Sequence, residues 1–422
     1  MCCVFSAVNA AIDRSTLTRS PAALCSGMDR REFLQATAAG TLIGATMAPA
    51  DDAQKTDDRS VPLAPPDKQP PDLDVPKPKD KAGWAIVGLG HLSVDEILPA
   101  FGTARMSECV ALVSGHPEKA KALARVYGIP EDAVLTYAEY DRLADMDAVD
   151  VVYNVLPNSM HAEFTNRALK AGKHVLCEKP MAGKVAECRS MIDTAKAAGR
   201  KLSIAYRLHH EPMNRKAMDL CRRQAFGEIK SISSTFTQNV SAPNIRLSAE
   251  LDGGSVGDVG VYCINACNYL TDSRPARVTA FKHQPPDDPR FREVAESFAW
   301  LAEYPSGVLA SCNCGFGAAF STRYEAQCAG GLIGMDPSFP YRGLRLWTQE
   351  SVDGVPRRTE HQIPPVNQFT EQLDDFSDCV LNDRPTRTPG EMGLADMLIV
   401  EAIHRSAREG RPVEIDWSAM PS

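Results

Sequence analysis

The chain has 422 residues, of which 44% are hydrophobic and 24% charged, and this length is enough for two globular domains with substantial cores. Its formal net charge is −8 and no long basic run occurs, which argues against a nucleic-acid partner. The 13 cysteines include no CxxC pair, and Cys312-x-Cys314 has no second pair at zinc-site spacing, so we expect buried free thiols and no metal centre.

Residues 1–50 have the pattern of an export signal. The adjacent pair Arg30-Arg31 precedes an uncharged run that ends in the small residues of Ala48-Pro49-Ala50. A charged start, an uncharged middle and a small-residue end make up a secretory signal, and paired arginines indicate the route that exports folded proteins. We therefore expect a twin-arginine signal that starts at Met28 and is cleaved after Ala50, with a periplasmic product. A retained anchor or a disordered tail are the alternatives.

Residues 51–81 are rich in proline, aspartate and lysine and contain few large apolar side chains. Such a segment is too polar to form a core of its own. We expect an extended arm that lies along a protein surface, with a neighbouring subunit's nucleotide site as one candidate.

Residues 82–207 alternate between short apolar runs and helical patterns. This alternation predicts a parallel sheet wrapped by helices, as in a Rossmann nucleotide-binding domain. The expected strands cover 84–90, 109–115, 150–157, 174–180 and 201–207, and the expected helices cover 94–103, 118–127, 161–171 and 185–198.

Residues 208–422 have a different sequence pattern, in which stretches typical of β-strands predominate. Apolar alternation recurs at 229–238, 276–283, 297–316 and 324–336, and helical patterns occur at 259–270, 368–381 and 390–409. We expect an α+β substrate-binding domain with one open, mostly antiparallel sheet, so that the whole chain is of the α/β class.

The turn after the first strand has the composition of a dinucleotide site. Gly88-x-Gly90 lies between an apolar strand and a helix, where glycine lets the backbone approach a pyrophosphate and the helix N-terminus offers N–H groups. The third position of the fingerprint is Ser93 instead of glycine or alanine, so the motif is incomplete.

The end of the second strand indicates which nucleotide fits. An NAD site usually has an acidic residue there for the ribose hydroxyl. Here Ser114-Gly115 and Lys119 provide a hydroxyl, open backbone and a cation, and no carboxylate precedes Glu118. This set favours the 2′-phosphate of NADP, although Lys119 could also be only a solvated helix charge.

Six motifs in order resemble one known family. They are AIVGLGHLSVDEILP, VSGHPEKAKALA, VLPNSMHAEF, AGKHVLCEKPMA, AYRLHHEPMNR and GGSVGDVGVYCIN. Over residues 84–417 the chain resembles the Gfo/Idh/MocA oxidoreductases, and within them most of all the exported glucose–fructose oxidoreductases that keep NADP bound. The resemblance implies a Rossmann domain followed by a substrate domain. The glycine-rich turn LDGGSVGD is one residue shorter than the glucose–fructose pattern, which leaves the sugar open.

The resemblance also implies roles for individual residues. Lys179 would lie at the nicotinamide and, with Asp258 and Tyr262, form the catalytic set. A lysine ammonium can stabilise an oxyanion, and a tyrosine four residues after Asp258 shares its helix face and can exchange a proton. The expected cofactor contacts are Gly88, Leu89, Gly90, His91, Ser114, Gly115, Lys119, Leu156, Pro157, Asn158, His161, Glu178, Lys179 and Arg207. The expected substrate contacts are Tyr206, His209, Asp258 and Tyr262, with His210 a further candidate.

The predicted function is an exported, NADP-containing sugar oxidoreductase. It would oxidise an aldose to its lactone and reduce a second sugar to its alditol by a ping-pong reaction. One alternative is an NAD-dependent glycosidase of the same superfamily, against which Ser114-Gly115 argues because it lacks a carboxylate. The other is a non-catalytic sugar sensor, against which the presence of Lys179 argues. We also expect a homo-oligomer, either dimer or tetramer.

Overall fold

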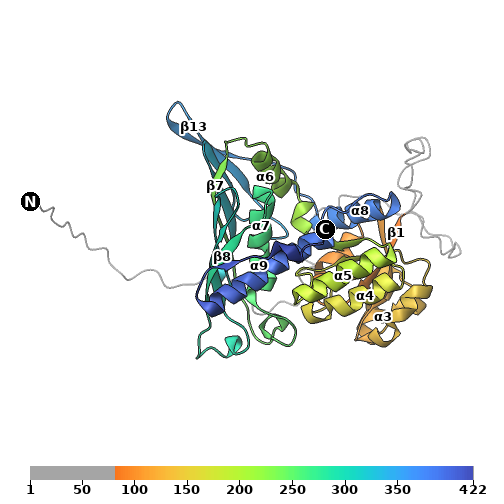
Figure 1. Cartoon of the computed structure of the whole chain (residues 1–422). Helices are drawn as coiled ribbons and strands as arrows, with labels where there is room; N and C mark the ends of the chain where they lie inside the picture. Colours follow the sequence, from red (N-terminus) through yellow and green to blue (C-terminus); the bar gives the residue numbers. More distant parts are fainter. Residues whose placement is uncertain (1–80, 422) are drawn as a thin grey trace, which may run out of the picture. The chain divides into compact units, whose positions relative to one another are not determined.

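A computed structural model of the protein describes residues 81–421, which form two β-sheets accompanied by helices (Figure 1). The expected signal at 1–50 and all but the last residue of the arm at 51–81 lie outside the described residues, so the start, cleavage and path of that segment stay predictions. None of the helices between residues 81 and 421 is long and apolar enough to cross a membrane.

The first sheet has six parallel strands in the order β3-β2-β1-β4-β5-β6, which confirms the predicted Rossmann fold. All six residues of β1 are buried, as expected for a parallel strand covered on both faces. The two-residue strand β3 was not predicted because it is too short to give a pattern. The strands are β1 (Ala82–Val87), β2 (Ser107–Val113), β3 (Val134–Leu135), β4 (Val151–Asn154), β5 (His174–Cys177) and β6 (Leu202–Ile204).

The helices that follow these strands lie close to their predicted positions. A helical segment with a π turn, η3 (Ser93–Ile97) and α2 (Leu98–Ala100), follows the glycine-rich turn. The others are α3 (Pro117–Tyr127), α4 (His161–Lys170) and α5 (Val185–Ala198). The last strand, β6, is shorter than expected, because the chain turns into a short 3-10 helix, η7 (Arg207–His209).

The second sheet has nine strands in the order β14-β13-β12-β11-β7-β10-β9-β8-β15. All neighbours are antiparallel except β7 and β10, which confirms the predicted open, mostly antiparallel sheet. The strands are β7 (Ile229–Asn239), β8 (Arg277–His283), β9 (Ser297–Glu303), β10 (Leu309–Gly315), β11 (Gly317–Cys328), β12 (Gly331–Met335), β13 (Leu346–Val352), β14 (Val355–Glu360) and β15 (Val413–Glu414).

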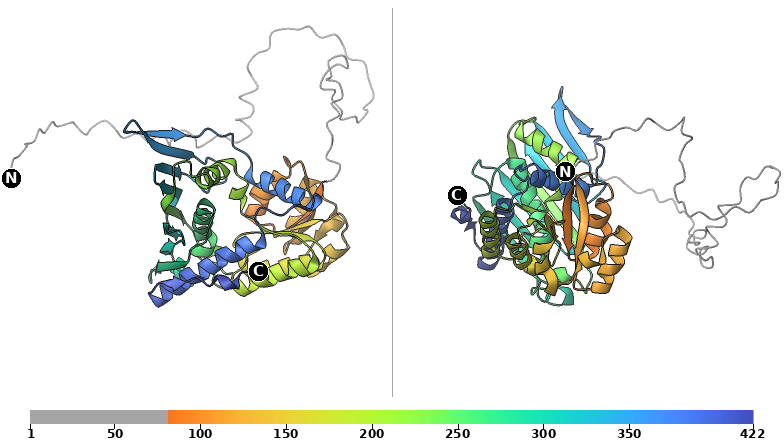
Figure 2. Two further views of the ribbon diagram at one scale, coloured as in Figure 1. Left: turned by 45° about the horizontal axis from the view of Figure 1, so that its top comes forward. Right: turned by 90° about the vertical axis from the view of Figure 1, so that its right-hand side faces the viewer.

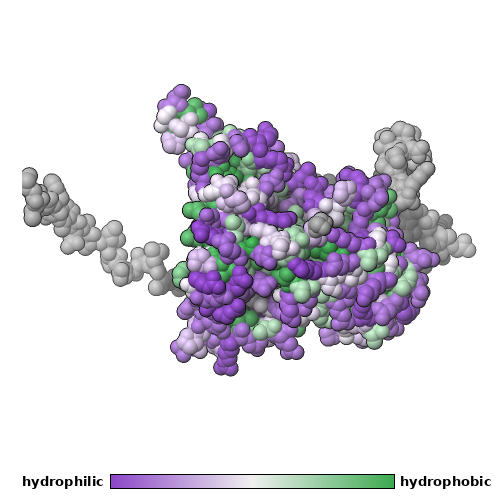
Figure 3. Space-filling view, in the orientation of Figure 1, coloured by the Kyte–Doolittle hydropathy of each residue, from purple (hydrophilic) through white to green (hydrophobic). Residues whose placement is uncertain are grey.

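Three helices lie between the two sheets in both Figure 1 and Figure 2. They are α6 (Pro212–Arg222), α7 (Val261–Thr271) and α9 (Gly390–Glu409). The helix α7 continues a π-helical turn, η9 (Val256–Gly260). The buried apolar residues of both sheets and these helices form one continuous core, while hydrophilic side chains predominate on the face shown in Figure 3.

The helix α8 (Gln368–Leu381) belongs by its position in the sequence to the expected second domain, yet it packs on the first sheet. It packs beside β1, as Figure 1 shows, and so it completes the first sheet instead of the second. The indole nitrogen of Trp84 donates to the Ser377 hydroxyl at 2.9 Å, and the carboxylate of Asp374 accepts from the backbone of Met106 at 2.9 Å. The chain thus returns to the first sheet after it has formed most of the second.

Candidate active site

The glycine-rich turn after β1, residues 88–91, leaves open space beside its backbone, and we call this turn the glycine cradle. Gly88 has a φ of +91°, and a Cβ atom there would lie 2.6 Å from the carbonyl oxygen of Val155, so only glycine fits. A Cβ atom at Gly90 would meet no atom within 4 Å, so open space lies in front of it. The helical segment that begins at His91 presents its first N–H groups there. Leu89 is buried, whereas the side chain of His91 is exposed.

The turn after β2 brings a cation to the same cradle. The Nζ atom of Lys119 donates to the carbonyl oxygen of Leu89 at 2.5 Å. Ser114 is buried and its hydroxyl accepts from the backbone N–H of His116 at 3.0 Å, while Gly115 is exposed. A glycine cradle, a neighbouring ammonium and the lack of an acidic side chain before Glu118 fit a dinucleotide with a 2′-phosphate.

Lys179 and Asp258 form an ion pair between the two halves of the fold. Lys179 follows β5, at the carboxyl edge where open α/β sheets bind ligands. Its Nζ atom donates to Asp258 Oδ1 at 2.8 Å and to the Asp258 carbonyl oxygen at 3.0 Å. Only 12% of the Lys179 side chain and 13% of the Asp258 side chain are exposed. An ammonium has three N–H groups, so one remains for a ligand.

The charges of this pair are mutually stabilised. Burial opposes ionisation of Asp258, but the Lys179 ammonium and the Arg246 guanidinium outweigh it and lower the pKa of Asp258 to about 2. Burial likewise disfavours the Lys179 ammonium, yet the Asp258 carboxylate outweighs that effect and raises the pKa of Lys179 above its usual range. Both groups are therefore charged at neutral pH.

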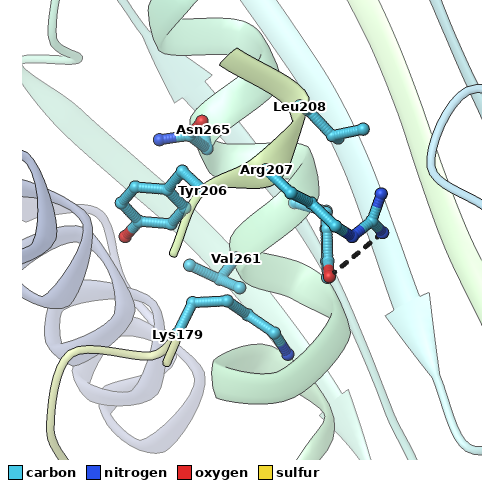
Figure 4. A pocket seen from close by; sticks show the side chains of 7 residues that line it. Lys179, Tyr206, Arg207, Leu208, Val261 and Asn265 are labelled. Carbon is cyan, nitrogen blue, oxygen red and sulfur yellow. Dashed lines mark hydrogen bonds between the residues drawn. The ribbon is translucent and has the colours of Figure 1, made fainter. Parts of the chain in front are cut away.

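Tyr262 lies beside this pair, four residues after Asp258. The centre of its ring is 5.1 Å from Lys179 Nζ, and its hydroxyl oxygen accepts from Arg207 Nη2 at 3.3 Å (Figure 4). The ring packs against Phe236 and Phe339 at centroid distances of 5.3 and 5.6 Å, which fixes its position. The structure thus brings the predicted set of Lys179, Asp258 and Tyr262 together.

Arg246 belongs to this site and was not predicted. It lies in a short 3-10 helix, η8 (Ile245–Leu247), and its Nε atom donates to Asp258 Oδ2 at 2.6 Å. No sequence motif contains it. The contact depends on how the loop between β7 and η9 closes on itself, which a single sequence does not show.

Arg207 was expected at the cofactor, and the structure shows what else it contacts. Its guanidinium is buried and turns toward the second sheet. It donates to the carbonyl oxygen of Phe339 at 2.5 Å, to the side chain of Gln368 and to the Tyr262 hydroxyl. Arg207 therefore positions Tyr262, and its predicted contact with the cofactor stays a prediction.

His161 was also expected at the cofactor, and it too is a positioning residue. The imidazole is fully buried. Its two ring nitrogens face the carbonyl oxygens of Pro180 at 2.8 Å and Leu156 at 2.9 Å, so neither is available to a nucleotide. The ring ties the loop after β4 to the loop that carries Lys179.

The loop after β4 reaches toward the second sheet. Leu156 is buried and Pro157 is half-buried. The side-chain amide of Asn158 donates to the carbonyl oxygen of Asp252 at 2.9 Å. These residues lie at the same sheet edge as the glycine cradle, and their predicted contacts with a cofactor stay predictions.

Glu178 and Tyr206, two further predicted contact residues, are both buried. Glu178 is buried and accepts from the Tyr153 hydroxyl at 2.7 Å, and its own burial raises its pKa. Tyr206 is buried and lines a small cavity with Lys179, Arg207 and Tyr262 (Figure 4).

His209 was expected to contact the substrate, and the structure places it against Asn265. Its Nε2 atom lies 2.8 Å from the side-chain oxygen of Asn265, a residue that lines both the small cavity at Lys179 and a larger one at His209, and burial lowers the pKa of His209 to about 4. His210 is buried against Asp375 of α8, with 3.6 Å between Nδ1 and Oδ2. Both histidines are buried, and their predicted contacts with the substrate stay predictions.

Comparisons with known proteins agree with this architecture. Aldose-aldose oxidoreductase from Caulobacter crescentus, solved with glycerol, is 40% identical, with a TM-score of 0.76 over 79% of this chain and 99% of that one. A 3-ketoreductase from Actinomadura kijaniata, solved with NADP and TDP-benzene, is 26% identical, with a TM-score of 0.69 over 78% of this chain and 98% of that one. D-xylose 1-dehydrogenase [NADP(+)] from Haloarcula marismortui is 28% identical over 79% of this chain and 93% of that enzyme.

Two family models match consecutive parts of the chain. Residues 82–206 match the oxidoreductase family with an NAD-binding Rossmann fold, and residues 214–333 match the GFO/IDH/MocA C-terminal domain. The two matches together span more than half of the sequence, and they agree with the two sheets described above. The chain therefore belongs to the Gfo/Idh/MocA family of oxidoreductases.

Proposed function

We propose that the protein is an NADP-dependent oxidoreductase that acts on the CH–OH groups of sugars. The observation that carries this proposal is the placement of Lys179, 2.8 Å from Asp258 and beside Tyr262, at the carboxyl edge of the Rossmann sheet. The turn with Ser114 and Lys119 supports NADP, because it offers a hydroxyl and a cation and no carboxylate. The activities named for the Haloarcula and Caulobacter relatives are of the same kind.

The glycine cradle and Lys119 would hold NADP, which supplies a reversible hydride acceptor when bound. The free N–H of Lys179 then binds the sugar oxygen that changes between hydroxyl and carbonyl, and it stabilises negative charge on that oxygen. Tyr262 gives a proton to this oxygen in the reducing direction and takes it back in the oxidising direction. Arg207 holds the Tyr262 hydroxyl in place, since its Nη2 atom donates to that oxygen.

We further infer that two sugars react alternately at this one site, as in glucose–fructose oxidoreductases. The first is oxidised to its lactone, and the second, a ketose or an aldose, is reduced to its alditol. The pair Arg30-Arg31 and the stretch Ala48-Pro49-Ala50 support export of the folded protein to the periplasm. A nucleotide carried there has to be restored in place, and its retention requires slow dissociation.

Two measurements test this proposal. Denaturing the purified protein should release NADP, and recovery of NAD alone would contradict the cofactor assignment. Incubating the protein with a pair of sugars and no added nucleotide should give lactone and alditol in equal amounts over many turnovers. If turnover stops after one equivalent unless free NADP is supplied, the alternating reaction is wrong and the protein is an ordinary dehydrogenase.

The second sheet supports the proposed homo-oligomer. The exposed large apolar side chains Phe281, Leu301 and Leu309 lie on the adjacent strands β8, β9 and β10, with exposed fractions of 73, 54 and 51%. Large apolar side chains gathered on one sheet face are typical of protein–protein contacts. Sedimentation or light scattering would determine the number of subunits, and a monomer at micromolar concentration would contradict the assignment.

A further inference from the structure

One nitrogen of the Arg246 guanidinium, Nε, donates to Asp258, and the two terminal amino groups are left for a ligand. Its Nε atom holds Asp258 Oδ2 at 2.6 Å, while Lys179 holds Oδ1 at 2.8 Å, so the carboxylate is shared between two cations. The Arg246 side chain is 44% exposed, compared with 12% for Lys179. Within residues 81–421 its two terminal amino groups make no hydrogen bond to another side chain or to the backbone. They are therefore accessible to a ligand at the catalytic set.

The glycine-rich turn that precedes Asp258 holds the backbone of Arg246 in place. The N–H of Gly254 donates to the carbonyl oxygen of Arg246 at 3.0 Å, and the N–H of Gly253 donates to that of Ser248 at 2.8 Å. A Cβ atom on Gly253 would lie 2.5 Å from the Arg246 oxygen, so only glycine allows this approach. The turn thus fixes the position from which the guanidinium reaches Asp258.

The charges indicate that Arg246 does more than neutralise Asp258. Lys179 already provides the carboxylate with one cation, and adding Arg246 gives the trio one net positive charge. A guanidinium held at Nε presents its terminal amino groups as a planar fork. Such a fork matches two neighbouring oxygens, which a lysine cannot bind in the same way.

We propose that Arg246 is a specificity-determining residue, whose terminal amino groups bind two neighbouring oxygens of the sugar. One is the oxygen on the reacting carbon, and the other is the hydroxyl on the carbon next to it. The ligand class is therefore an aldose with a free hydroxyl adjacent to the reacting carbon. This inference rests on the proposed function, because Lys179 and Tyr262 define the position of the reacting carbon.

A sugar that lacks the adjacent hydroxyl leaves half of the fork without a partner. Hydrogen bonds to a charged group contribute about 1.5–3 kcal/mol. The wild-type protein should therefore favour an aldose over its 2-deoxy analogue by about 10- to 100-fold in kcat/KM. The preference should appear in equilibrium binding as well, since the hydroxyl is bound before the reaction.

The test compares Arg246→Gln and Arg246→Lys with the wild type on an aldose and its 2-deoxy analogue. Both variants should lose most of the discrimination, because the aldose loses two hydrogen bonds and the analogue loses only the one to the reacting oxygen, so kcat/KM falls about 10- to 100-fold further for the aldose than for the analogue. Arg246→Lys keeps a cation beside Asp258, and it therefore separates loss of the fork from loss of charge. Arg277→Gln is the matched control, because Arg277 is 49% exposed and also pairs with one carboxylate, Glu303.

Calorimetric binding of the two sugars to the protein as purified provides a readout besides activity. The Arg246 variants should bind the aldose about as weakly as they bind the analogue, with unchanged nucleotide content. Equal losses on both sugars, or full recovery by lysine, would show that Arg246 only holds Asp258. A wild-type protein that oxidises aldoses without this preference would also overturn the inference. A wild-type protein that neither binds nor oxidises any aldose would instead overturn the proposed function, and this inference with it.

Discussion

The Lys179 ammonium and the Asp258 carboxylate join the two sheets of the protein across 2.8 Å. Lys179 follows β5 of the parallel sheet, whereas Asp258 lies at the start of the helix that packs on the antiparallel sheet. Because each residue comes from a different part of the fold, the site exists only when the two sheets are assembled. The catalytic set therefore forms with the tertiary structure, and the Arg246 loop adds a third element to it.

Replacing Lys179 by alanine should abolish most of the activity and leave the fold intact. Asp258 keeps Arg246 as a cationic partner in this variant, so no buried carboxylate loses all its partners. Loss of one charged donor at a developing oxyanion costs about 10²- to 10³-fold in kcat. Steady-state kinetics, the nucleotide released on denaturation and the melting temperature would be measured together. Hydride transfer at the normal rate with a full complement of nucleotide would show that Lys179 does not take part in the reaction.

The Asp258 charge should make the protein sensitive to acid. Its pKa is lowered from 3.8 to about 2 in the folded protein, so its contribution to stability is present above pH 4 and lost as the pH falls toward 2. A shift of this size corresponds to about 2 kcal/mol in the free energy of unfolding. Urea unfolding at a series of pH values should show a steeper loss of stability in the wild type than in Asp258→Asn. Parallel curves for the two proteins between pH 4 and pH 2 would contradict the assignment.

Several elements could be predicted from the sequence to the residue. The helices α5, α8 and α9 begin and end where their apolar periodicity does, because local pattern and tertiary packing agree there. The short strand β3 and the helix α6 were not predicted. The packing of α8 on the first sheet was not predicted either, because it depends on a contact between residues almost 300 positions apart, such as Trp84 and Ser377.

The residues of the site divide in the same way, into those that a local motif reveals and those whose role depends on contacts between distant parts of the chain. Lys179, Asp258 and Tyr262 were found because each lies in a recognisable motif. His161 lies in a motif too, yet its motif does not reveal that both ring nitrogens face backbone carbonyl oxygens. Arg246 was missed because its role comes from a loop whose closure depends on tertiary contacts.

Lys119 should decide the preference between the two nucleotides. Replacing it by methionine removes the ammonium that lies at the glycine cradle, 2.5 Å from the carbonyl oxygen of Leu89. The affinity for NADP should fall about tenfold while that for NAD stays the same, because only NADP carries the 2′-phosphate. Ser114→Asp should act in the same direction through like-charge repulsion. Titration of the nucleotide-free protein with each nucleotide gives the two Kd values.

Lys121→Met is the control for the nucleotide experiment. Lys121 lies on the same helix, is 42% exposed in its side chain and interacts only with Glu118, at 3.7 Å, among the charged residues of the described chain. It should change neither Kd. An equal loss of NAD and NADP affinity in Lys119→Met would mean that Lys119 stabilises the turn and does not bind the 2′-phosphate.

Gly253 should affect sugar selectivity although it has no side chain that could contact the sugar. It lies against the carbonyl oxygens of Arg246 and Ser248. An alanine Cβ there would lie 2.5 Å from the Arg246 oxygen and 2.6 Å from the Ser248 oxygen, so the η8 segment has to move. Gly253→Ala should therefore reduce the discrimination between an aldose and its 2-deoxy analogue about as much as Arg246→Gln does. Gly257→Ala is the matched control, because its Cβ would meet only Pro180, at an ordinary contact distance of 3.8 Å. Measuring kcat/KM on both sugars checks the prediction, and a Gly253→Ala protein with wild-type selectivity would show that the turn does not position Arg246.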